Sequence, residues 1–292
     1  MTQPTGGLLN RAAPFLFVLL WSSSFPGARV GLRQMSPLAF VAARMILTAC
    51  ILVLIMLVLR RSWSVLRHSW YHCAIVGVLT QAILLMTAHV AMTRSQAAQI
   101  ALIQTLNPLL TALLAWPVLR ERLRPLQILG LILGFAGVLL VLGLSAIGNR
   151  AELPGLLATA AGVGALCCGT LYYGRFCRAV PPLEGATVQL LACAGVCAAA
   201  TALLENPWVH WTGALVAAIG WNAIAVSLGG MALYFLMLTR GTAARATANF
   251  YLVPGVTSVL TWAILGETLS PLTILGLIVS SAGCWLVGRK PP

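Results

Sequence analysis

Ten apolar stretches, joined by short polar connections, constrain the fold of this chain more than any other feature of its sequence. They cover residues 12–32, 38–59, 71–92, 97–118, 125–144, 154–175, 182–204, 213–238, 243–264 and 271–288. A helix needs about 20 apolar residues to cross a bilayer, and the short connections make consecutive helices antiparallel neighbours. The sequence therefore predicts an all-α integral membrane protein with ten transmembrane helices.

Charged side chains are too few for a water-soluble protein. Only 8% of the 292 residues are charged, against roughly 25% in a soluble domain. One lysine, five glutamates and no aspartate cannot cover a water-facing surface, so soluble enzymes and disordered chains are excluded. The lipid bilayer is the expected surrounding. The apolar run after Arg11 is interpreted as a retained first helix, because no convincing cleavage site follows it.

The cations predict how the chain is oriented. If the N-terminus lies inside, thirteen of the eighteen Lys and Arg residues fall in the inside connections. Cytoplasmic loops carry such an excess, which predicts cytoplasmic termini and a location in the inner (plasma) membrane. The cations stand singly or in small groups, so nucleic acid is not an expected partner. The remaining cations are Arg44, within a span, and the outside residues Arg29, Arg33, Arg94 and Arg150.

The two halves of the chain resemble each other. Shifted by 146 residues, half the length, residues 97–142 align with residues 243–288 without a gap and with 21 identities in 46 positions. The sequence therefore predicts two five-helix domains, residues 1–146 and 147–292. The matched positions include Pro108 and Pro254, Trp116 and Trp262, Glu121 and Glu267, and Arg29 and Arg175.

An odd number of helices per copy predicts that the second copy enters the membrane from the opposite side. The connection at residues 120–124 holds three arginines, whereas its copy at residues 266–270 holds none. Inverted repeats are a recurrent plan of secondary transporters, with the substrate bound near mid-membrane between the repeats. We therefore expect two inverted repeats around a central cavity, working by alternating access.

Three motifs add a family resemblance. They are Trp21-Ser22-Ser23-Ser24-Phe25, Asn107-Pro108 with Leu119-Arg120-Glu121, and Pro254 with Leu265-Gly266-Glu267. Across essentially the whole chain, this pattern resembles the drug/metabolite transporter superfamily, in its EamA-type branch. The resemblance implies transport of small metabolites, and within the branch the YddG-like amino-acid exporters are the nearest group. Export of amino acids, aromatic and other neutral ones above all, is the expected function. Uptake or facilitated transport of another small metabolite or drug is the alternative.

Polar residues inside the spans are the candidates for lining the cavity, because a polar group is costly in lipid unless it faces protein, a cavity or a substrate. Pro108 leaves a carbonyl one turn back without its N–H partner, and Pro254 is the matching expected kink. Alternatively, both prolines only bend their helices. The other candidates are Trp21, Ser22, Gln81, His89, Gln104, Asn107, Tyr172, Gln189, Ser227, Tyr234, Asn249 and Tyr251. For the aromatic residues among them, core packing or anchoring at the interface is the alternative.

Arg44 and His89 leave two questions open. Arg44 lies about six residues, roughly 9 Å, inside the outer end of its span. It could hold a substrate carboxylate by a two-point contact, tie helices together, or reach back to the interface. No predicted span has a carboxylate near its centre, and His89 is the one side chain at a cavity position that titrates near neutrality in its reference state. The sequence predicts either proton linkage through His89 or facilitated diffusion.

Other functions have less support. An integral-membrane enzyme would need a nucleophile, an acid–base group or a metal constellation, and no such motif is present. Cys193 with Cys197, like His68 with His72, supplies only two ligands, so neither a metal nor a cofactor is expected. A channel would show rings of charge or a filter sequence. The small-residue spacing of Gly130 and Gly134 permits close helix packing, either within a monomer, the favoured state, or in a dimer.

Overall fold

The computed structural model describes residues 7–63, 69–107, 109–110, 125–148, 150–233, 237, 252–268 and 271–288. Within these ranges the chain is helical apart from its connections, and the one extended pairing is an isolated bridge between Met35 and Val209. The helices are α1 (Gly7–Leu32), α2 (Pro37–Val58), α4 (Trp70–Gly77), α5 (Ile83–Met92), α6 (Ala97–Gln104), α8 (Pro125–Gly148), α9 (Leu153–Phe176), α10 (Pro182–Leu204), α11 (Gly213–Gly220), α14 (Val253–Leu265) and α15 (Pro271–Gly288), with the π-helices η1 (Val78–Ala82) and η2 (Trp221–Gly230).

Helix occupies nearly all of the described part of each apolar stretch. Six of the described helical segments are long and apolar enough to cross a membrane. They cover Ala12–Leu32, Pro37–Val58, Trp70–Met92, Leu153–Phe176, Pro182–Leu204 and Gly213–Leu233. Many of their large apolar side chains are exposed, Leu203 and Phe15 among them, and such exposure suits a surface that faces lipid rather than water.

Prolines mark where several helices begin. Pro37, Pro125, Pro182 and Pro271 each stand at the first position of a helix. The first N–H groups of a helix have no partner within it, so the N–H that proline lacks costs nothing there. At α2 the free N–H groups of Leu38 and Ala39 instead meet the carboxylate of Glu205, at 3.2 and 3.1 Å. This glutamate therefore caps α2 from the end of α10.

Two long helices contain a wider turn near their middle. The segment α4–η1–α5 is continuous from Trp70 to Met92, and α11 passes directly into η2 at Trp221. A π-helical turn shifts the hydrogen-bond register by one residue, and such turns are frequent at functional sites. Both segments also hold residues from the sequence-based candidate set, Gln81 in η1 and Ser227 in η2.

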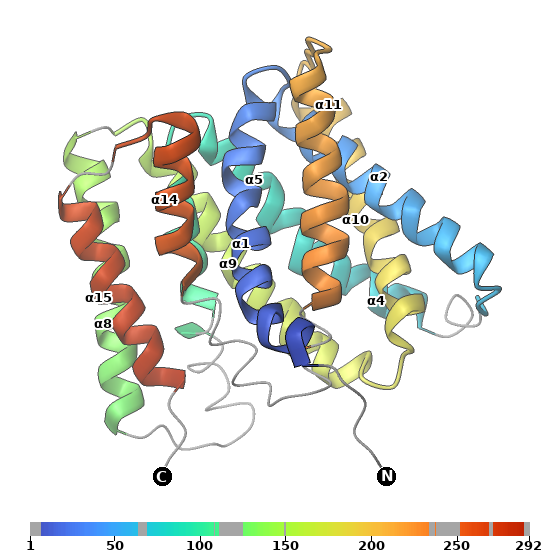
Figure 1. Ribbon diagram of the computed structural model, residues 1–292, viewed down its shortest axis with the longest axis horizontal. Coiled ribbons are helices and arrows are strands. Elements are labelled where there is room, and N and C mark those ends of the chain that lie inside the picture. Colours follow the sequence, from blue (N-terminus) through green and yellow to red (C-terminus); the bar gives the residue numbers. More distant parts are fainter. Residues whose placement is uncertain are drawn as a thin grey trace.

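In Figure 1, α8, α14 and α15 lie on one side of α1, and α2, α4, α10 and α11 lie on the other. On one side α8 and α15 pack directly on each other through small residues: a Cβ atom at Gly137 would lie 2.6 Å from the Gly276 carbonyl oxygen, and one at Gly283 would lie 2.5 Å from that of Gly130. Gly130 thus lies against Gly283, and the later residue Gly137 lies against the earlier residue Gly276, so the two helices are antiparallel. The small-residue faces are thus used within the chain.

The largest buried cluster lies around α1, α5, α6 and α9, and a smaller one joins α2 to α10. The first includes Phe40, Ile100 and Leu102, and the second includes Met45 and Cys193. Both clusters draw side chains from the two halves of the chain. The packing of the bundle therefore depends on contacts between the halves, which is where the candidate site lies.

Candidate functional site

Arg44 is buried where α1, α2 and η2 meet. Its side chain is on α2 and only 5% of the residue is exposed. Its Nε and Nη2 atoms donate to the hydroxyl of Ser227 on η2, at 3.2 and 3.1 Å. Its Nη1 atom donates to the hydroxyl of Ser24 on α1, at 3.4 Å. Among the described residues, no carboxylate forms an ion pair with this guanidinium.

The two serine hydroxyls can accept from Arg44 because their own protons point elsewhere. Ser24 donates to the side-chain oxygen of Asn222 at 2.8 Å, and Ser227 donates to the backbone oxygen of Asn222 at 2.9 Å. Asn222 is fully buried, and its amide nitrogen donates to the Ala218 carbonyl at 3.0 Å. Both hydroxyl oxygens therefore present a lone pair to the Arg44 guanidinium. Hydroxyl dipoles solvate the cation without cancelling its charge.

A second contact across the halves lies two residues before Ser24 on α1. Ser22 is fully buried, and its hydroxyl donates to the backbone oxygen of Val253 at 3.2 Å. Val253 is the first residue of α14, and Pro254 follows it within the first helical turn. The residues that would precede a kink here, 238–251, lie outside the described ranges, so the kink at Pro254 stays a prediction.

His89 lies buried on α5, beside α2. Its Nδ1–H donates to the Leu85 carbonyl at 2.8 Å, and its ring lies 5.7 Å from that of Phe40. The other ring nitrogen, Nε2, has no hydrogen-bond partner among the described residues. A buried nitrogen with a free lone pair is available to take a proton or to accept from a ligand.

The other candidates from the sequence lie at several places around this network. Trp21 stands against Gly230 of η2, and Asn107 accepts from the thiol of Cys167 on α9 through its side-chain oxygen at 3.2 Å. Gln104 ends α6, and Thr105 forms the turn that interrupts the helix three residues before Pro108. Gln81 is partly buried in η1, and the backbone of Gln189 packs on Gly77.

Tyr172 lies near the end of α9, in a cluster of aromatic side chains that does not include Arg44. Its hydroxyl is 2.8 Å from the Nδ1 atom of His72, and its ring is 4.5 Å from that of Phe176. Cys177 follows α9 directly, and burial raises the pKa of its thiol. This aromatic cluster joins the start of α4 to the end of α9. Four further candidates, Pro108, Tyr234, Asn249 and Tyr251, lie outside the described residues.

Sequence reasoning missed an ion pair at the end of the bundle where α1 and α14 finish. We call this the Arg29 end. Nε of Arg29, in the last turn of α1, donates to Oε1 of Glu267 at 3.0 Å. Gly266 has a φ of 68°, a left-handed conformation that favours glycine, and it turns Glu267 back toward α1. Nearby, the Gln96 side chain donates to the Thr268 carbonyl at 3.2 Å.

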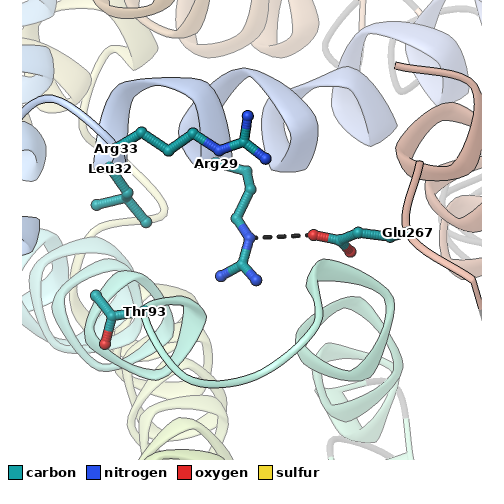
Figure 2. Close-up of a pocket in the computed structure, with 5 residues that line it drawn as sticks. All are labelled: Arg29, Leu32, Arg33, Thr93 and Glu267. Atoms are coloured by element: carbon teal, nitrogen blue, oxygen red, sulfur yellow. Dashed lines mark hydrogen bonds and ion pairs between the residues drawn. The ribbon is translucent and has the colours of Figure 1, made fainter. Parts of the chain in front are cut away.

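A pocket of about 330 Å³ adjoins this pair. Figure 2 shows the Arg29 side chain reaching across it, with its Nε atom facing Glu267 and its two terminal nitrogens turned away. Ser24 was also missed as a partner of Arg44, although it stands in the Trp21–Phe25 motif. The motif that ends in Glu267 was the one sequence signal for the ion pair. The lining residues of the pocket are Arg29, Leu32, Arg33, Thr93 and Glu267.

Comparison with known proteins gives a consistent result. The chain is 22% identical to the uncharacterized transporter YvbV of Bacillus subtilis, in an alignment that covers 94% of this chain and 89% of the relative. It is 26% identical to the uncharacterized inner membrane transporter YedA of Escherichia coli, over 96% of this chain and 92% of the relative. It is also 26% identical to a probable terminal-alkyne amino-acid exporter of Streptantibioticus cattleyicolor, over 94% of this chain and 92% of the relative. A crystal structure of a protein that is 23% identical superposes with a TM-score of 0.69 over 95% of both chains, which shows a shared fold.

The family assignment rests on two matches within the chain. Residues 12–143 and residues 154–289 each match the EamA-like transporter family. The two matches together cover far more than half of the sequence. With six helices able to cross a membrane, the chain is a multi-pass membrane protein that belongs to the EamA-like transporter family, within the drug/metabolite transporter superfamily.

Proposed function

We propose that this transporter exports amino acids across the inner membrane, and that Arg44 binds the carboxylate of the substrate. The observation that carries the proposal is the buried guanidinium of Arg44, held only by neutral groups among the described residues. A charge at membrane depth is costly unless it is paired. A substrate carboxylate would supply the missing countercharge and bind a planar fork of donors by two points.

The position of Arg44 supports this role. Its partners come from α1 in the first half and η2 in the second half, so a ligand bound there contacts both halves at once. A site that bridges two moving units responds to their relative position. Substrate bound at Arg44 would therefore bias the equilibrium between the two access states by its different contacts in each.

The architecture that we propose is ten helices in two inverted repeats, residues 1–146 and 147–292. The two family matches support it. Helix limits recur at the offset of 146: α8 begins at Pro125 and α15 at Pro271, while α2 ends at Val58 and α10 at Leu204. When 146 is added to the residue numbers of η1, the resulting range falls within η2. Since α8 and α15 are antiparallel, these two related helices run in opposite directions.

The exposed fraction of a side chain is also the same at two positions 146 residues apart. Ile132 on α8 and Ile278 on α15 are both 61% exposed. Equal exposure at related positions indicates that both copies turn the same face outward. In the proposed cycle the two halves rock about the Arg44 network, with both termini in the cytoplasm. The Arg29 end then faces the outside, and the substrate passes from the cytoplasm to that end.

Counterflow in proteoliposomes tests this function. Vesicles are loaded with one unlabelled amino acid and given a trace of the same labelled compound, across aromatic, aliphatic, basic and acidic types. We expect labelled aromatic or other neutral amino acids to accumulate transiently inside loaded vesicles only. The absence of counterflow for every amino acid, from protein that is folded and correctly reconstituted, would refute amino-acid transport.

A further inference from the structure

The pocket at the Arg29 end has more cationic than anionic side chains. Two arginines, Arg29 and Arg33, line it with one glutamate, Glu267. Its volume of about 330 Å³ is at the lower end of the roughly 300–1,000 Å³ of small-molecule sites. The pocket therefore has the room and the charge for one small anion beyond the glutamate already present.

The ion pair leaves most of the Arg29 donors unused. Glu267 meets only the Nε atom of Arg29, and no acceptor among the described residues meets its two terminal nitrogens. In Figure 2 these nitrogens point away from Glu267. A guanidinium binds a carboxylate best through two parallel N–H groups, and the two terminal nitrogens of Arg29 still offer such a fork.

Glu267 itself is only half paired. Its Oε1 atom accepts from Arg29, whereas its buried Oε2 atom has no donor among the described residues. A single, partly solvated ion pair of this kind holds Arg29 in place without neutralising the whole pocket. Arg33 has no ion-pair partner among the described residues and adds a second cation to the same wall.

From this geometry we infer a second anion site, outside the Arg44 network, that binds a small carboxylate at the two terminal nitrogens of Arg29, with Arg33, four residues further along the chain and just after α1, adding a second positive charge to the pocket. Glu267 stays on the Nε side and fixes the orientation of Arg29. The carboxylate is that of the transported amino acid, a step that rests on the proposed function. The site would hold the substrate at the mouth of the transporter, beyond the contacts that join α1 to α14.

Saturation-transfer difference NMR on the detergent-solubilised full chain tests the site without any transport. The probes are acetate and, as the matched compound without a carboxylate, methylammonium. Acetate is expected to bind and methylammonium not. Arg29→Gln and Arg33→Gln are made in an Arg44→Gln background, because Arg44 is itself proposed to bind a carboxylate. There Arg29→Gln should lower the acetate affinity by about tenfold, the scale of losing one charge-assisted hydrogen bond, and Arg33→Gln should lower it severalfold, because the pocket loses one of its two cations. In Glu267→Gln it should rise severalfold, because the pocket loses its competing negative charge.

Two controls keep the result specific. Arg94→Gln removes an exposed arginine that does not line the pocket, and should leave acetate binding unchanged. Arg44→Gln alone removes the proposed central site. Acetate should still bind to this variant, at the site that depends on Arg29 and Arg33. Thermal unfolding of each variant shows whether it is folded. Because this assay is independent of counterflow, an absence of amino-acid transport would not mimic an absence of the site.

Three results would overturn the inference. One is an acetate affinity that neither Arg29→Gln nor Arg33→Gln changes in the Arg44→Gln background. The second is a loss in Arg94→Gln as large as in those two variants. The third is displacement of acetate by an equal concentration of chloride, because the site would then select charge alone and not the carboxylate group.

Discussion

Ser227 accepts two hydrogen bonds from Arg44, from Nε at 3.2 Å and from Nη2 at 3.1 Å, and so links η2 of the second half to α2 of the first. One hydroxyl oxygen thus carries most of the solvation of a buried cation. The same hydroxyl closes the wide turn of η2 by donating to Asn222, at 2.9 Å. The irregular helix and the buried charge therefore depend on each other.

Ser227→Ala is expected to destabilise the fold markedly. It removes the acceptor of a buried charged group, a loss of about 1.5–3 kcal/mol. Thermal unfolding in detergent measures the effect. Ser23→Ala is the matched control, because the partners of Ser23 among the described residues are the neutral groups of Leu20 and Trp221, and its loss should cost less. Equal melting temperatures for the two variants would contradict the solvating role of Ser227.

The contact between α8 and α15 predicts opposite effects for two kinds of glycine. In Gly137→Ala the new methyl group would press on the backbone of Gly276 and Ser280, and overpacking costs about 1–3 kcal/mol. In Gly164→Ala and Gly195→Ala the methyl group meets open space, and these helices should gain roughly 0.5–1 kcal/mol. Thermal unfolding of the three variants decides the matter. Stabilisation by Gly137→Ala would show that the helices do not pack this closely.

The cap on α2 predicts a graded series at Glu205. Its carboxylate accepts from the N–H groups of both Leu38 and Ala39. Glu205→Ala leaves both groups unpaired and should cost about 1 kcal/mol. Glu205→Gln keeps one acceptor oxygen but loses the charge that a helix N-terminus favours, so its melting temperature should lie between those of wild type and Glu205→Ala. Identical melting temperatures in all three proteins would remove the cap from the account.

His89 is the position where proton coupling can be tested. Its Nε2 atom is buried and unpartnered among the described residues, so this nitrogen can exchange a proton as the site opens. We expect His89→Gln to abolish accumulation driven by a proton gradient while counterflow continues. The matched control, His210→Gln, changes an exposed histidine and should have no effect. Full gradient-driven accumulation in His89→Gln would show that His89 does not carry the coupling proton, whereas no gradient-driven accumulation in the wild type would leave facilitated diffusion as the mode of transport.

The helix limits could be predicted from the sequence because they follow from the length of each apolar run. The runs 182–204 and 271–288 coincide with α10 and α15, and the run 71–92 lies within one residue of the Trp70–Met92 segment. Prolines at helix starts give the same limits independently. The ends of hydrophobic stretches are local properties, and one sequence is enough to read them.

Side-chain pairing across the halves could not be predicted in this way. Arg29 and Glu267 are 238 residues apart, and Arg44 and Ser227 are 183 apart. Any of several arginines could have reached Glu267, and only the packing of α1 on α14 selects one. The π-turns likewise leave no composition signal, because they depend on which side chains, such as Ser227, can close the wider turn.

Counterflow of amino acids by Arg44 variants tests the central claim most directly. Arg44→Gln removes the charge and Arg44→Lys keeps it without the planar fork; transport and folded yield are measured separately. We predict that Arg44→Gln, purified in folded form, has no counterflow, and that Arg44→Lys transports with a weakened apparent affinity. Wild-type counterflow in folded Arg44→Gln, or a loss of yield with normal transport by the folded fraction, would show that Arg44 supports the structure and does not bind the substrate.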